Sequence, residues 1–189
     1  MSKHLLFMAE ATRLATESVE NNWGGPFGAV ITRDGKIVAR GQNRVLLTGD
    51  PTAHGEVEAI RKAVQVLNPS APSIARNRQN TSTLKLIRRE EGSPDKVEYR
   101  ARMLKGCAIY TSGAPCPMCM SAIYWARLDA VYFACDLKAT EDIGFSDAYQ
   151  YEDFKKPLDE RLIRIRQVHP ELGDTAYRAW KCKCDKHPY

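Results

Sequence analysis

The sequence predicts an α/β fold in three layers, in which a central mixed sheet of about five strands lies between helices. Two observations lead to this prediction. Segments with helical periodicity alternate along the chain with short apolar runs of strand length, and a tight turn at Asp34-Gly35 joins two of these runs directly. A chain of 189 residues is long enough to bury the core of such a fold within one domain.

The N-terminal part of the chain predicts a helix followed by a hairpin. Residues 4–22 carry apolar or small side chains at helical spacing, and Gly24-Gly25-Pro26 ends this helix. Residues 27–32 form an apolar run that is typical of a buried strand. Residues 36–39 return as the second strand, so we expect the two strands to be antiparallel neighbours.

A second helix and a long irregular segment follow the hairpin. The Asp50-Pro51-Thr52 segment is a helix start signal, with Thr52 as the N-cap. Residues 69–105 are rich in Ser, Pro, Asn and charge and show poor periodicity. We therefore expect one domain over residues 1–189, in which 69–105 is a surface insertion with at most a short helix near residues 96–104.

The C-terminal half of the chain completes the predicted sheet. Residues 107–111 and 130–135 are short apolar strands, with a helix through residues 122–126 between them. Residues 161–168 alternate partly between apolar and basic side chains, as a half-exposed final strand does. A last helix is expected over residues 174–181.

Two short motifs contain the residue types of a catalytic metal site. His54-Gly55-Glu56 lies at the start of the second helix, and Pro115-Cys116-Pro117-Met118-Cys119 at the start of the third. One imidazole and two thiolates provide three ligands for a tetrahedral Zn²⁺, and a catalytic zinc keeps its fourth position for water. The predicted ligands are His54, Cys116 and Cys119. Glu56 is the natural proton carrier for that water, and this layout is typical of zinc deaminases.

The combination of the two motifs carries the metal prediction, because each motif alone is weak evidence. Cysteines three residues apart share a helix face, and a helix N-terminus favours the thiolate that binds metal. We therefore expect one Zn²⁺ per chain. The other closely spaced pair, Cys182 and Cys184, lacks further ligands and is not expected to hold a metal.

Composition and charge narrow the class of protein. The apolar fraction of 43% and the charged fraction of 27% are typical of a globular protein, and no apolar run approaches the roughly 18 residues of a membrane span. The N-terminal apolar stretch is too short for a signal peptide, so we expect the cytoplasm, where cysteines stay reduced. The net charge of +5 is spread along the chain, which favours a solvated surface over a nucleic-acid partner.

Several segments along the chain match one family of enzymes. These segments are residues 24–30, 41–43, 50–54, 115–119, 122–127 and 144–147. On them the chain resembles the cytidine-deaminase-like superfamily, and within it most closely the small bacterial guanine deaminases. The zinc motif is common to the superfamily. The features that point to guanine deaminases within it are Gly144-Phe145-Ser146-Asp147 and the aromatic C-terminus.

The resemblance implies the same zinc ligands and further roles in binding a nucleobase. Asn43 would hydrogen-bond the base, Phe27 and Trp125 would line the ring pocket, and Asp147 would bind the edge that carries the amino group. A C-terminal segment ending in Tyr189 would close over the partner subunit's site in a swapped homodimer. The alternatives are a solvated helix-start residue for Asp147, simple core for Trp125 and a frayed tail for Tyr189.

Three features depart from the family pattern. Gly55 stands where the family usually has alanine, and glycine weakens a helix turn by up to about 1 kcal/mol. Ala114 stands where guanine deaminases place a glutamate before Pro-Cys, which alters the field beside the zinc. The third departure is the insertion at 69–105, which compact family members lack.

These features together predict a zinc-dependent hydrolytic deaminase of a free purine-like base, with guanine, converted to xanthine and ammonia, as the leading candidate. Glu56 and Asp147 are the expected catalytic residues. The nearest alternatives are deaminases of guanosine, cytosine, an amino-triazine or a pterin. A tRNA adenosine deaminase has the same zinc motif but requires an open groove for RNA. A non-catalytic zinc-binding module is a third alternative, which the presence of Glu56 disfavours.

Overall fold

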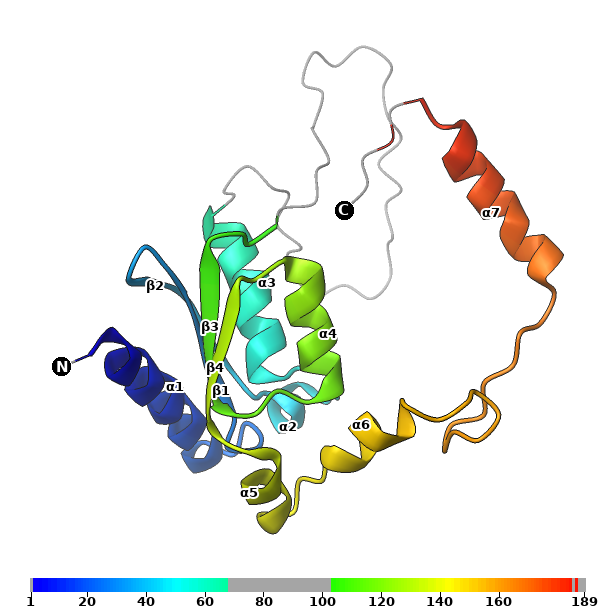
Figure 1. Ribbon diagram of the computed structural model, residues 1–189. Helices are drawn as coiled ribbons and strands as arrows, with labels where there is room; N and C mark the ends of the chain where they lie inside the picture. The colour runs from blue at the N-terminus through cyan, green and yellow to red at the C-terminus, as the bar shows by residue number, and fades with distance from the viewer. Residues whose placement is uncertain (1, 68–102, 185, 187–189) are drawn as a thin grey trace.

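The computed structural model describes residues 2–67, 103–184 and 186, and its core is a mixed sheet between helices (Figure 1). The strands are β1 (Gly28–Arg33), β2 (Lys36–Gln42), β3 (Cys107–Gly113) and β4 (Ala130–Cys135). Their order in the sheet is β2-β1-β3-β4. Strand β1 is antiparallel to β2 and β3, whereas β3 and β4 are parallel. The predicted mixed sheet is confirmed, with four strands among the described residues where about five were expected.

Helices cover both faces of this sheet, as the predicted three-layer fold requires. Helix α1 (Lys3–Glu20) packs on one face, and α3 (Gly55–Leu67) and α4 (Pro117–Ala126) pack on the other (Figure 1). Neighbouring side chains of β1 point to opposite faces, so Val30 belongs to the core beneath α1, whereas Ile31 belongs to the core beneath α3 and α4.

Helix α3 begins at Gly55, later than the predicted N-cap at Thr52. Asp50 accounts for the difference, because its side chain accepts hydrogen bonds from the backbone N–H and the hydroxyl of Thr52. The backbone N–H of Ala53 also donates to the Asp50 carbonyl oxygen at 3.0 Å. Residues 50–53 therefore form a turn, and His54 directly precedes the helix.

The predicted strand at residues 161–168 is wrong, because these residues form no strand in the structure. They belong to a C-terminal arm that extends away from the sheet and ends in α7 (Pro170–Cys182), which is longer than predicted (Figure 1). Ile163 and Leu162 of this arm are 78% and 70% exposed. Without a neighbouring strand to pair with, the alternating pattern alone does not produce a strand.

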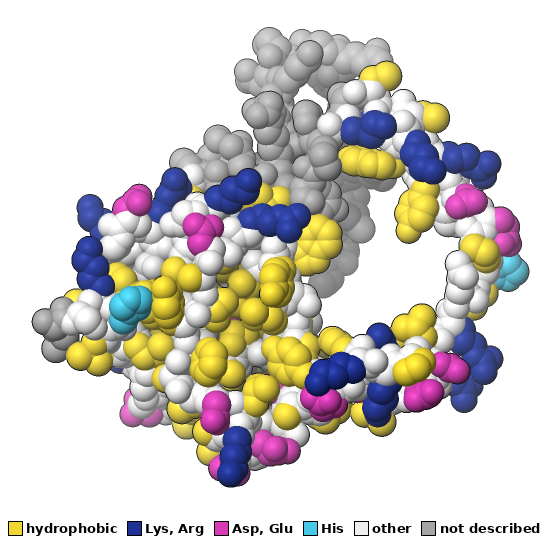
Figure 2. Space-filling view, viewed as in Figure 1, with side chains coloured by type: hydrophobic (Ala, Val, Ile, Leu, Met, Phe, Trp, Pro, Cys, Tyr) yellow, Lys and Arg dark blue, Asp and Glu magenta, His cyan; other side chains and the backbone are white. Residues whose placement is uncertain are grey.

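Apolar side chains are also exposed on the sheet itself. Strand β4 is the outer strand next to β3, and Tyr132 and Phe133 are 40% and 51% exposed there. Figure 2 shows apolar side chains gathered on the face where β4 lies. Both the arm and the edge of the sheet thus present apolar surface that the described chain does not cover.

Three short helices that the sequence did not predict complete the fold. They are α2 (Val45–Thr48), α5 (Leu137–Asp142) and α6 (Ala148–Asp153). Most of the insertion at 69–105, with residues 96–102 of the short helix predicted at 96–104, and the terminal Tyr189 lie outside the described residues. Residues 103 and 104 are described and are not helical. No helix in the described part of the chain is long and apolar enough to cross a membrane.

Candidate active site

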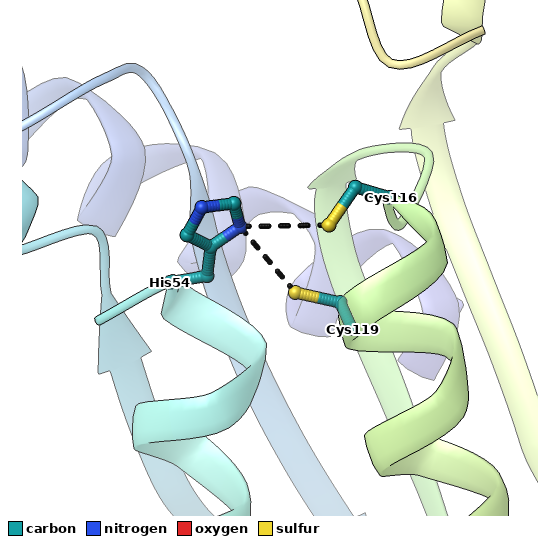
Figure 3. A group of neighbouring side chains, drawn as sticks. All are labelled: His54, Cys116 and Cys119. Carbon is teal, nitrogen blue, oxygen red and sulfur yellow. Dashed lines mark hydrogen bonds between the residues drawn. The ribbon is translucent and has the colours of Figure 1, made fainter. Parts of the chain in front are cut away.

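The three predicted metal ligands converge at the starts of two neighbouring helices. His54 directly precedes α3, Cys116 is the N-cap of α4, and Cys119 lies in the first turn of α4. Figure 3 shows the imidazole of His54 pointing towards both sulfur atoms. The predicted group is therefore confirmed, although Cys116 follows His54 by 62 residues in the chain.

The distances within this group fit a tetrahedral metal ion. His54 Nδ1 lies 3.6 Å from Cys116 Sγ and 3.5 Å from Cys119 Sγ, and the three ligand atoms lie within 4.8 Å of one another. Zn–N and Zn–S bonds of about 2.0 and 2.3 Å at the tetrahedral angle place nitrogen and sulfur about 3.5 Å apart. Since no further side chain of the described residues joins the group, the site suits one Zn²⁺ with an open fourth position.

The electrostatics of Cys116 also favour a cation. A hydrogen bond from Cys119 lowers the pKa of Cys116 to about 4, and a hydrogen bond with His54 adds to this effect. The contact with Cys116 and burial together raise the pKa of Cys119. Cys116 is thus a thiolate at neutral pH, which is the form that binds metal.

Glu56 lies in the first turn of α3 and is almost fully buried, with 6% of its surface exposed. Burial raises the pKa of its carboxyl, and the negative charge of Cys116 raises it further. A buried carboxyl holds a proton more readily than an exposed one. Glu56 therefore has the environment of a proton carrier.

A cavity of ≈ 240 Å³ lies beside the ligands. Its lining residues come from the loops and helix starts around the metal group and are Gly24, Gly25, Phe27, Asn43, Val45, Leu46, Pro51, His54, Glu56, Ala114, Cys116, Phe145 and Asp147. Clefts for drug-sized ligands measure about 300–1,000 Å³, so this cavity suits a smaller molecule. A wider hollow of ≈ 460 Å³ beside Lys105 and Arg127 lies at the opposite ends of β3 and α4, away from the ligands.

Two of the predicted substrate-binding residues, Asn43 and Phe27, line the cavity. The ring of Phe27 meets that of Phe145 edge to face, with centroids 5.0 Å apart. Phe145 belongs to the Gly144-Phe145-Ser146-Asp147 segment of the family resemblance, but no role in binding was predicted for its ring. The two rings give the cavity an apolar wall, and Asn43 provides a polar one.

Asp147 also lines the cavity and is the N-cap of α6, where its side chain makes no capping hydrogen bond. Burial raises the pKa of its carboxyl, and the charge of Cys116 adds to this effect. The carboxyl therefore makes no hydrogen bond to the backbone N–H groups of α6 and is available to a molecule in the cavity.

The remaining two predicted residues do not line the cavity of the described chain. Trp125 is 60% exposed near the end of α4, where the guanidinium of Arg127 lies 6.0 Å from its ring centroid. Roughly 9 Å of helix rise separates Trp125 from Cys119. Trp125 therefore lies neither in the core nor in the wall of this cavity. Tyr189 lies outside the described residues.

Two of the departures from the family pattern lie at the site. A Cβ atom on Gly55 would be 3.0 Å from the carbonyl oxygen of Phe27, so the glycine allows α3 to start close behind that residue. Ala114 lines the cavity itself. A methyl group there leaves this part of the wall uncharged.

Fold and site together define a zinc-dependent deaminase. The sequence pattern described as the cytidine and deoxycytidylate deaminase zinc-binding region matches residues 1–135, and the chain belongs to this family of hydrolases. The resemblance seen in the sequence is thereby confirmed.

Within the family, the chain is similar to guanine deaminase from Bacillus subtilis. The two are 39% identical over 186 residues, which cover 98% of this chain and 99% of that protein. The X-ray structure of the Bacillus subtilis enzyme matches with a TM-score of 0.79 over 100% of this chain and 99% of that chain. A tRNA-specific adenosine deaminase from Aquifex aeolicus is 28% identical over 128 residues, 68% of this chain and 63% of that protein.

Proposed function

We propose that this protein hydrolyses guanine to xanthine and ammonia. The observation that carries the proposal is the 39% identity to a guanine deaminase over nearly the whole of both chains. The small cavity beside the metal ligands supports it, because its wall combines two aromatic rings with the amide of Asn43 and the carboxyl of Asp147. Such a wall suits a flat base with polar edges.

His54, Cys116 and Cys119 would hold the zinc ion, which lowers the pKa of a bound water and so supplies the nucleophile at neutral pH. In the reaction, a C–O bond forms at C2 of guanine and the bond from C2 to the amino nitrogen breaks. Glu56 takes one water proton and passes it to the ring nitrogen beside C2. It then delivers the second to the departing amino group, which leaves as ammonia.

The remaining cavity residues would bind and orient the base. Phe27 and Phe145 contact its ring faces or edges, Asn43 donates hydrogen bonds to it, and Asp147 accepts from the amino group that is lost. These roles are consistent with a site that positions one face of the ring over the metal ligands.

The proposal is tested by ammonia release from guanine by the purified, zinc-loaded protein at neutral pH. We expect one xanthine per ammonia, and little release from guanosine, because a ribose adds bulk to a cavity of ≈ 240 Å³. Faster release from guanosine, cytosine, an amino-triazine or a pterin would assign that substrate instead. Activity only on tRNA, with binding that weakens as salt rises, would instead assign a tRNA deaminase activity, like that of the Aquifex aeolicus relative that is 28% identical to the chain.

We also propose that the protein is a homodimer in which each C-terminal segment crosses to the partner. A segment and a strand edge that lack pairing partners in the described chain support this exchange of C-terminal segments. Residues 161–168 alternate like a strand but pair with none in the described chain, and β4 is an outer strand with unpaired backbone groups. α7 has no buried residue. Adding the 161–168 segment of one chain to β4 of the other would cover both surfaces and bring Tyr189 towards the partner's cavity.

Mixing two inactive variants tests this exchange. One chain carries Glu56→Gln with a complete tail, and the other keeps Glu56 but lacks residues 187–189. If the tail serves the partner's cavity, each homodimer is inactive and the mixture regains activity, because the mixed dimer pairs an intact cavity with an intact tail. Full activity of the truncated chain, no recovery on mixing, or a monomeric mass in solution would each contradict the exchange.

Residues 69–105 we propose to be a surface insertion in a single domain. The described residues on either side support this, since α3 ends at Leu67 and β3 begins at Cys107, at the ends of these elements farthest from the cavity. Deletion of 69–102 with a short linker is expected to leave turnover of guanine largely unchanged.

We further propose the cytoplasm as the location of the protein, because the thiolate ligands Cys116 and Cys119 have to remain reduced.

A further inference from the structure

The main chain of Asn43 is fixed from two sides. Its N–H donates to the carbonyl oxygen of Phe27 at 2.8 Å, and its own carbonyl oxygen accepts from the hydroxyl of Ser18 at 2.6 Å. Asn43 is 4% exposed and Ser18 is fully buried. Because the backbone cannot adjust, the direction in which the side chain presents its amide depends on local contacts.

A third hydrogen bond, made by the side chain of Asn43, fixes that direction. The backbone N–H of Val45 donates to Oδ1 of Asn43 at 3.2 Å. Only the oxygen of the amide accepts a hydrogen bond, and its nitrogen only donates. The Nδ2 group, which has no protein partner among the described residues, is therefore the part of the amide left for a molecule in the cavity.

Gly24 provides the space that this arrangement requires. A Cβ atom on Gly24 would overlap Oδ1 of Asn43 and would lie 2.9 Å from its Cγ. The backbone of Gly24 is not in the left-handed region, so alanine is allowed there by its own conformation. The Cβ atom would also lie 3.0 Å from the backbone carbonyl oxygen of Asn43, but the overlap with Oδ1 is by far the closer contact. The main cost of a side chain at this position therefore falls on the side-chain amide of Asn43.

We propose that Gly24 is a positioning residue for substrate recognition: the lack of a side chain lets Asn43 turn Oδ1 to Val45 and present two N–H donors to the base. The inference rests on the proposed function and deepens it. It requires a base with acceptor atoms, a carbonyl oxygen or ring nitrogens, on the edge that faces Asn43. In its carboxylate form Asp147 offers only acceptors, so a base with acceptors and donors on separate edges, as guanine has, matches both residues.

A double-mutant cycle tests the coupling between the two residues. Gly24→Ala, Asn43→Ala and the double variant are compared for KM with guanine and for the Kd of xanthine, which does not react further. We expect each single change to raise KM and Kd about tenfold or more, as loss of hydrogen bonds to a buried polar ligand does, with zinc content unchanged. In the double variant, Gly24→Ala adds little, because the alanine that replaces Asn43 has no amide to displace.

The matched control is Gly25→Ala. A Cβ atom on Gly25 would lie 2.9 Å from the ring of Phe27 and 3.0 Å from that of Phe145, away from Asn43. The factor by which Gly25→Ala changes KM for guanine and the Kd of xanthine is expected to be the same in the wild type and in the Asn43→Ala variant. If Gly24→Ala costs as much in the Asn43→Ala variant as in the wild type, Gly24 acts independently and the inference is overturned.

Hydrogen exchange of the Val45 amide gives a readout that does not depend on activity. Gly24→Ala is expected to speed this exchange about as much as Asn43→Ala does, because both remove the acceptor of the Val45 N–H. Unchanged exchange in Gly24→Ala would overturn the inference. A wild-type protein that releases no ammonia from guanine would instead contradict the proposed function, and the exchange result would still decide the role of Gly24.

Discussion

The hydroxyl of Tyr151 donates a 2.7 Å hydrogen bond to the carbonyl oxygen of Pro115, the residue before the metal ligand Cys116. This contact ties α6 to the turn that carries the ligands. Asp147 is the N-cap position of the same helix, one turn earlier, and lines the cavity. The distance between the carboxyl of Asp147 and the metal group therefore depends on a bond made by a residue outside the cavity wall.

Tyr151→Phe is expected to raise KM for guanine by up to about tenfold, since one such hydrogen bond contributes about 0.5–1.5 kcal/mol. Zinc content should not change, because no ligand is lost. Steady-state kinetics and metal analysis measure both quantities. The control is Tyr149→Phe on the same helix, where the tyrosine is 53% exposed. Equal kinetics in the two variants would show that the Tyr151 hydroxyl does not position Asp147.

Glu56→Gln is expected to keep one zinc per chain and to lower kcat by at least about 10²–10⁴-fold, the usual contribution of a general acid–base. Glutamine has nearly the same shape as glutamate but cannot accept the proton from water. Glu58→Gln is the control on the same helix, because Glu58 forms a 2.8 Å ion pair with Arg61 and does not line the cavity. Near-normal turnover in Glu56→Gln would remove the assigned role.

Asp147→Asn is expected to reduce kcat/KM for guanine far more than for any pyrimidine that the protein accepts. The amide replaces one acceptor oxygen with a donor, which opposes the amino group of the base and leaves a buried polar contact unmatched. Competition assays with guanine and cytosine measure the difference. An equal loss on both bases would mean that Asp147 does not distinguish them.

Removal of the metal is expected to abolish activity and to lower the melting temperature, and added Zn²⁺ should restore both. The three ligands connect the start of α3 to the start of α4, so the ion stabilises the packing of two helices. Cys119→Ser is expected to lose the metal. Cys182→Ser changes an exposed thiol and should retain one zinc, and a lower stoichiometry in that variant would contradict the assigned ligand set.

Glu10→Gln is expected to lower the free energy of unfolding at pH 7 by up to about 1 kcal/mol, the usual limit for partly exposed ion pairs. Hydrogen bonds from Arg13 and Arg40 hold the pKa of Glu10 at about 2, below its ordinary value of 4.5. The stabilisation is therefore complete above about pH 4.5 and is lost as the pH falls towards 2. Urea unfolding across this range measures it, with Glu20→Gln at the end of the same helix as the control.

Local sequence was sufficient to predict most of the secondary structure, and two local motifs taken together predicted the metal ligands. The spacing of Cys116 and Cys119 needs only one helical turn to bring two sulfur atoms to one face. The strands at residues 107–111 and 130–135 followed from apolar runs that remain inside the observed β3 and β4. These are local properties, because each depends on residues within a few positions of one another.

The way the cavity is built depends instead on tertiary packing. Gly24, Asn43 and Phe145 come from three separate segments, and no pattern within any one of them indicates that it meets the others. The alternation at 161–168 predicted a strand, yet a strand forms only where a neighbouring edge accepts its hydrogen bonds. Trp125 likewise lay in a matched segment, but the packing of α4 turned it outwards. Long-range packing set these outcomes, because the contacts join residues that are distant in the chain.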